Sequence, residues 1–135
     1  MSTVLERYRD ISSFEYFNTA LRVRRDVTAL VTSAAFPKSY RFVLAVPMAE
    51  TARSLVYNLV TANAFYPNTD HNVTQRRHYM TLAVADCEQL LQDLQCVIDL
   101  GVVKVSRCAR IADDVETAAK LIKGARKGVK LIGQG

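Results

Sequence analysis

Two histidines and a short acidic cluster are the side chains whose types could support acid–base or metal chemistry. His71 lies beside Asp70, and His78 follows seven positions later, so both histidines share a helical face only if a helix begins before His71. The cluster Asp113-Asp114-x-Glu116 lies early in a helical pattern, where the helix dipole favours negative charge without any catalytic role. We therefore expect no metal, no cofactor, and solvated or capping roles for the histidines.

Motifs that mark common enzyme classes are missing from the sequence. It has no glycine-rich phosphate loop, no HExxH and no GxSxG. The Glu-x-x-His pair that holds a di-iron centre in some four-helix proteins is also absent. We predict that the protein is not an enzyme.

Basic side chains are the stronger functional signal, and they are unevenly distributed. The net charge is +5, with ten Lys/Arg and six Asp/Glu in residues 1–77, and eight and three in residues 104–135. Residues 78–103 carry four acids and no Lys or Arg. Two interpretations stay open: helices whose surface charges neutralise one another, or a basic face that binds phosphates while the acidic segment faces another subunit.

Several basic residues are candidates for binding nucleic acid. The Arg76-Arg77 pair opens an expected helix, where the dipole disfavours positive charge, and such locally unfavourable residues indicate a partner. The predicted nucleic-acid-binding residues are Arg22, Arg25, Lys38, Arg41, Arg76, Arg77, Lys120, Lys123, Arg126, Lys127 and Lys130. Few aromatic residues lie near them in sequence, so we expect contacts with phosphates or RNA shape rather than base stacking.

The elements that position these residues follow from apolar residues spaced three and four apart, which predicts helices. The first helix is expected from a cap at Ser12 or Ser13 to Phe36-Pro37, with a stripe that begins at Tyr16 and ends at Ala34. The second begins at Lys38 or Ser39 and ends near Tyr66-Pro67. Its expected stripe is Phe42, Val46, Ala49, Ala52 or Arg53, Val56, Leu59 or Val60, and Asn63.

Pro47 falls inside the second helix. An interior proline costs about 3 kcal/mol, so the helix either bends at 43–46 or a short first piece ends there. We expect a bend, because the apolar spacing continues on both sides.

The third helix is expected from about Val73 to Gly101, and the fourth from a cap at Ser106 to Ile122. These patterns predict an all-α protein, an antiparallel up-down-up-down four-helix bundle. We expect a single domain over residues 1–135, with an N-terminal arm at 1–11. Glycines after Ile122 predict fraying into a basic C-terminal tail over 124–135.

Cysteine use and hydropathy point to the cytoplasm. Cys87, Cys96 and Cys108 have no metal-ligand spacing and lie in apolar helical surroundings, so we expect three buried thiols. The N-terminus lacks the pattern of a signal peptide. No apolar run reaches the roughly 18 residues that a membrane span needs, so no membrane association is expected.

The second expected helix carries a resemblance to a known family. Its start, Phe36-Pro-Lys-Ser-Tyr-Arg-Phe-Val-Leu44, and its late Ala62-Asn63 resemble the pattern of the accessory variability determinant proteins of diversity-generating retroelements. The Arg-Arg-x-Tyr at 76–79 and the Leu-Leu-x-x-Leu-Gln at 90–95 match that family's third helix. These proteins share a four-helix-bundle superfamily with the ribosomal-RNA intervening-sequence proteins.

The resemblance implies a homopentameric ring that binds a reverse transcriptase and RNA, or DNA, through its basic surface and supports error-prone cDNA synthesis. The alternative within the superfamily is a structural or interaction protein of the intervening-sequence type with no nucleic-acid role. The family's Gly-Gly-Trp-Ile near the end of the fourth helix is Lys123-Gly124-Ala125-Arg126 here, and the chain has no tryptophan.

Overall fold

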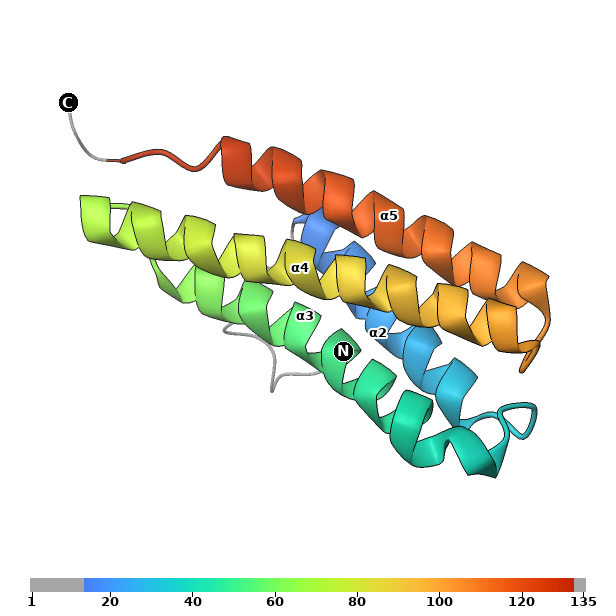
Figure 1. The fold of residues 1–135 in the computed structure, drawn as a ribbon. Coiled ribbons are helices and arrows are strands. Elements are labelled where there is room, and N and C mark those ends of the chain that lie inside the picture. The colour runs from blue at the N-terminus through green and yellow to red at the C-terminus, as the bar shows by residue number, and fades with distance from the viewer. Residues whose placement is uncertain (1–13, 133–135) are drawn as a thin grey trace, which may run out of the picture.

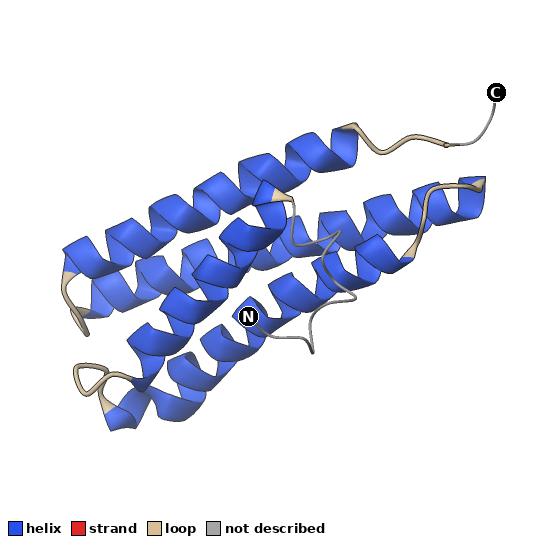
Figure 2. Cartoon of the chain, turned by 180° about the vertical axis from the view of Figure 1, so that it is seen from behind, coloured by secondary structure: helices blue, strands red, loops and turns tan. Residues whose placement is uncertain are grey.

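The computed structural model describes residues 14–132, and these form four α-helices with no strand among them. The helices are α2 (Glu15–Thr32), α3 (Val46–Ala64), α4 (Asp70–Leu100) and α5 (Val105–Lys127). Each packs against its neighbours in sequence, and α2 also packs against α5, which closes a four-helix bundle (Figures 1 and 2). The expected bundle is confirmed. The predicted arm at 1–11 lies outside the described residues.

The bundle interior is filled by side chains that recur three and four positions apart on each helix. Val23, Val27 and Leu30 of α2 are fully buried, as are Leu90 and Leu94 of α4. Burying one such side chain contributes about 1.5–3 kcal/mol. The stripes predicted for the first, third and fourth helices therefore supply much of the core.

Helix α2 is shorter than predicted at its C-terminus. It ends at Thr32, four residues before the Phe36-Pro37 stop, and Ala34 lies exposed in the following loop. The Ser33 hydroxyl donates to the Leu30 carbonyl at 2.8 Å, which satisfies an end carbonyl and stops the helix early. At the N-terminus the cap position is Phe14, without a side-chain cap bond.

The second helical segment begins at Lys38, as predicted, but its first eight residues are not α-helical. A 3₁₀ turn, η2 (Lys38–Tyr40), and a π-helical stretch, η3 (Arg41–Ala45), precede α3. The Val46 N–H bonds the Arg41 carbonyl, five residues back, so Pro47 falls in the first turn of α3, where its missing N–H costs little. The π-helical stretch passes into α3 without a break, and its wider turn accommodates the proline.

The π-helical stretch also shifts the apolar stripe. Phe42 is 80% exposed and Val46 is exposed, whereas Leu44 and Ala45 are buried. The wider turn moves the inward-facing positions out of the phase that the 3.6-residue period predicts. After Pro47 the core positions are Met48, Ala52, Leu55, Val56, Leu59 and Ala62.

Both remaining helices are longer than predicted. Helix α4 begins at Asp70 because the Asn72 N–H donates to the Thr69 hydroxyl at 3.1 Å, and it ends at Gly101, whose φ of 66° confirms the predicted glycine stop. Helix α5 begins at Val105, with Lys104 rather than Ser106 at the cap position. It continues to Lys127, so fraying from Gly124 was a wrong expectation.

The three thiols differ in exposure. Cys87 and Cys108 are buried as expected, but Cys96 is exposed on the outer face of α4. Burial, helped by the neighbouring charges of Asp86 and Glu88, raises the pKa of the Cys87 thiol to about 12. Cys87 is therefore an unreactive core side chain.

One carboxyl group is buried between α3 and α4. Asp86 is 7% exposed and accepts hydrogen bonds from the Ser54 hydroxyl and the Asn58 amide, both at 2.8 Å. Desolvation raises the pKa of Asp86, and the Ser54 and Asn58 bonds oppose the rise only in part. The hydrogen bonds of Asp86 join α3 and α4, but burying the ionised carboxylate costs free energy of folding, and this cost depends on pH.

This cost predicts a pH-dependent stability. A carboxyl whose folded pKa is raised favours folding while it is protonated, and that contribution is lost as pH rises through the folded pKa. Asp86→Asn removes the titration, so the free energy of unfolding of the variant should improve relative to wild type as pH rises above the ordinary pKa of an aspartate, about 4. Urea unfolding at pH values below and above this pKa measures the difference. Glu88→Gln, an exposed neighbour, is the control, and an equally flat difference for both variants contradicts the prediction.

Candidate nucleic-acid interface

The predicted basic residues do not form one patch, because the antiparallel helices carry them to different parts of the bundle. Lys38 and Arg41 lie at the end with the α2–α3 connection. Arg76, Arg77 and the basic residues of 123–130 lie at the opposite end, where α4 begins and α5 finishes (Figure 1). Arg22 and Arg25 lie between, on α2.

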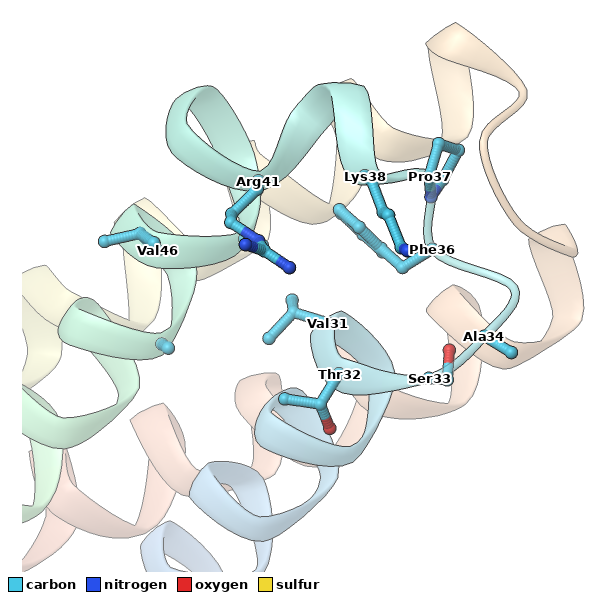
Figure 3. A pocket seen from close by; sticks show the side chains of 11 residues that line it. Val31, Thr32, Ser33, Ala34, Phe36, Pro37, Lys38, Arg41 and Val46 are labelled. Atoms are coloured by element: carbon cyan, nitrogen blue, oxygen red, sulfur yellow. The ribbon is translucent and has the colours of Figure 1, made fainter.

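Lys38 and Arg41 line a groove of about 510 Å³ at the α2–α3 end. Figure 3 shows the Arg41 side chain extending from η3 toward Val31 at the end of α2, while Lys38 lies beside Phe36. The floor is mostly apolar, and both cations lack an ion-pair partner within residues 14–132. This groove therefore combines apolar surface with two unneutralised charges.

The two arginines of α2 are partly neutralised within the chain. Arg22 Nε lies 3.7 Å from an Asp114 carboxylate oxygen of α5, and Arg25 Nε lies 3.5 Å from Asp26 Oδ1. Such exposed pairs contribute at most about 1 kcal/mol and leave the arginines accessible. The Arg22 pair also gives a structural role to a member of the acidic cluster at 113–116.

The Arg76-Arg77 pair finds its partners in the chain itself. Arg76 donates to the Phe65 carbonyl at 3.3 Å and to Asn63 Oδ1 at 3.5 Å, which ties α4 to the end of α3. Arg77 donates to the Val129 carbonyl, beyond the end of α5. The helix dipole disfavours positive charge at the start of α4, and these hydrogen bonds within the chain explain why two arginines are nevertheless found there. Their position therefore does not by itself indicate an outside partner.

The Arg77 bond fixes the segment after α5 in place. Val129 is buried, and the Ile132 N–H donates to the Pro67 carbonyl at 2.8 Å. Arg126 Nη1 also donates to the Thr81 hydroxyl at 3.1 Å across α4 and α5. Residues 128–132, predicted to belong to a frayed tail, thus form a docked tail that covers the connection between α3 and α4.

A row of lysines remains free for a ligand. Lys120, Lys123 and Lys127 are exposed and spaced three and four residues apart, so they share one face of α5. Lys130 of the docked tail is exposed beyond them. None of the four has an ion-pair partner in the part of the chain that the structure describes. We call Lys120, Lys123, Lys127 and Lys130 the lysine row.

Sequence reasoning missed aromatic side chains near these charges. Phe14, Tyr16 and Tyr66 line a groove of about 620 Å³ together with Arg76 and Lys130. The sequence did not predict this grouping, because about fifty residues separate Tyr16 from Tyr66 in the chain. Burial raises the pKa of Tyr16, and the positive charge of nearby Arg76 partly opposes this effect.

A second aromatic contact was also missed. The Tyr57 ring on α3 lies under two guanidinium groups, with Arg53 Cζ at 4.7 Å and Arg24 Cζ at 5.5 Å from its centroid. The Arg53 hydrogen bond and charge, with a smaller effect of Arg24, lower the pKa of Tyr57. The signal available in the sequence was the Arg53-x-x-x-Tyr57 spacing, which places both on one helix face.

The histidines have aromatic neighbours. His71 lies edge-on to Phe65, with ring centroids 6.4 Å apart, and His78 lies edge-on to Tyr79 at 5.3 Å. Among residues 14–132, no three His, Cys, Asp or Glu side chains are grouped so that they could hold a metal ion. Over the same range, no helix combines the length and the apolar character needed to cross a membrane.

No protein-family model matches the chain, and no curated protein matches it.

Proposed function

We propose that this protein is a non-enzymatic, nucleic-acid-binding accessory subunit of the reverse transcriptase of a diversity-generating retroelement. The observation that carries the proposal is the lysine row, four exposed cations at one end of the bundle with no acid paired to them among residues 14–132. The motif Phe36-Pro37-Lys38-Ser39 at the start of the second helix supports the retroelement assignment by resemblance. In this role the protein acts in the cytoplasm and binds the polymerase and its RNA template, or DNA.

Phosphate contacts are the interaction that this surface offers. Lysine is a flexible point charge that binds phosphate without reading sequence, and each phosphate that it neutralises releases a counterion. The i, i+3, i+7 spacing of Lys120, Lys123 and Lys127 places three charges along about 10 Å of helix, a span that matches successive phosphates of a nucleic-acid backbone. Binding should therefore be strongly salt-dependent.

Removal of the row should change that dependence. In the triple variant Lys120→Ala/Lys123→Ala/Lys127→Ala, the slope of log affinity against log salt concentration should fall by about 2, since each single-strand contact contributes about 0.7. Fluorescence anisotropy with a labelled single-stranded RNA measures this slope. The matched control, Lys38→Ala/Arg41→Ala/Lys104→Ala, removes three exposed charges elsewhere and should keep the wild-type slope.

Two outcomes would count against the proposal. If the control variant loses the slope and the triple variant keeps it, the interface lies at the α2–α3 end instead. If wild-type protein binds no RNA at low salt, alone or with the polymerase, the nucleic-acid function is contradicted.

The second candidate is a structural or interaction protein of the ribosomal-RNA intervening-sequence type with no nucleic-acid role. The observation in its favour is that Arg22, Arg25, Arg76 and Arg77 are all engaged within the chain. The same salt series separates the candidates. A gene for a reverse transcriptase, with template and variable repeats beside it, would argue against this second function.

We also propose that the subunits assemble into a homo-oligomeric ring, a pentamer by resemblance. Apolar side chains left on the surface support assembly, with Phe42 and Val43 80% and 68% exposed and Leu21 and Phe14 also accessible. Phe17, which follows Tyr16 in α2, is buried inside the subunit and does not contribute to this surface.

Light scattering tests the ring. The expected mass is near five times the 15.1 kDa of one chain. Phe42→Ser/Val43→Ser should shift this mass toward the monomer, whereas Tyr66→Ser, an exposed ring at the other end, should not. A monomeric wild-type protein at micromolar concentration contradicts the ring.

A further inference from the structure

The groove at the tail end of the bundle, which we call the tail groove, is built from three separate parts of the chain. Phe14 and Tyr16 come from the start of α2, Tyr66 comes from the α3–α4 connection, and Lys130 comes from the docked tail. Its volume of about 620 Å³ falls within the range of about 300–1,000 Å³ that is typical of small-ligand sites.

Aromatic faces in the tail groove are available to a ligand. The Tyr66 ring is 59% exposed, although the groove is otherwise formed by packed elements. Phe14 is 38% exposed and stacks on Tyr16, with ring centroids 5.2 Å apart and planes 14° from parallel. A flat ligand can extend such a stack, because parallel π-faces pack well in offset geometry.

The charge of the tail groove is entirely positive. Arg76 and Lys130 line it, and within residues 14–132 no Asp or Glu does. A guanidinium has five N–H donors, and the Arg76 bonds to Phe65, Asn63 and Tyr16 leave two of them for a phosphate. Lys130 is exposed and has no ion-pair partner in the described part of the chain. The groove therefore suits a planar ring joined to an anion.

We propose that the tail groove binds one unpaired nucleotide, with its base stacked on Tyr66 and its phosphate held by Arg76 and Lys130. The inference rests on the proposed nucleic-acid function and makes it specific, since it assigns the lysine row to the backbone and the tail groove to a base. A base-paired nucleotide does not fit this role, because both faces of its base are already stacked within the duplex. The protein accordingly prefers single-stranded to double-stranded nucleic acid.

Removing the bases from the ligand tests the stacking directly. The probes are a 12-residue oligothymidylate, an abasic oligonucleotide with the same number of phosphates, and a 12-base-pair duplex, at one salt concentration. Wild-type protein should bind the oligothymidylate about 5- to 150-fold more tightly than the abasic probe, the range expected when a base–aromatic stack is lost.

Three variants locate the preference in the tail groove. Tyr66→Ala should lose most of the difference between the two single-stranded probes, and Tyr66→Phe, which keeps the ring, should retain it. Lys120→Ala should weaken both probes alike, because it removes a phosphate contact alone. Tyr66 is largely exposed, and circular dichroism checks that each variant stays folded.

The possible outcomes distinguish a failure of the stacking proposal from a failure of the proposed nucleic-acid function. If wild-type protein binds the thymidylate and abasic probes equally, or if Tyr66→Ala keeps the full preference, stacking in the tail groove is overturned while the proposed function stands. If wild-type protein binds none of the probes and no structured RNA at low salt, the proposed function fails, and this inference fails with it.

Discussion

The basic end of this bundle depends on the hydrogen bond that Arg77 donates to the Val129 carbonyl. Besides this bond, residues 128–132 are held by the burial of Val129, the packing of Leu131 against the core and the Ile132–Pro67 hydrogen bond. Docking places Lys130 beside Arg76 and near aromatic rings from two distant segments. The Arg77 guanidinium thereby helps to hold residues 128–132 in place as one wall of a groove.

The bundle could be predicted because its helices are amphipathic and marked by strong end signals. Gly101 reads as a stop from sequence alone, since its left-handed backbone suits glycine. The second helix was harder, because Pro47 admits either a bend or a break. The π-helical solution depends on how Leu44 and Ala45 reach the core, and no fixed period encodes it. Thr69 was likewise hidden as a cap within a polar loop.

The candidate site was predictable in its residue types but not in its grouping. Exposure of Lys120, Lys123 and Lys127 follows from their positions off the apolar stripe of α5. The pairing of Arg22 with Asp114 and the meeting of Tyr66 with Lys130 depend on contacts between segments far apart in sequence. The sequence predicted little base stacking because Tyr66 is far from Lys130 in the chain. The two residues line one groove only after the helices have packed antiparallel.

The central claim is that nucleic acid binds at the end of the bundle where the docked tail meets α4. Hydrogen–deuterium exchange of the full chain, with and without a single-stranded RNA, tests it most directly. The account predicts slower amide exchange in residues 120–132 and 65–77 on RNA binding, with residues 33–46 at the opposite end unchanged. Protection confined to residues 33–46, or none at an RNA concentration that saturates binding, would contradict it.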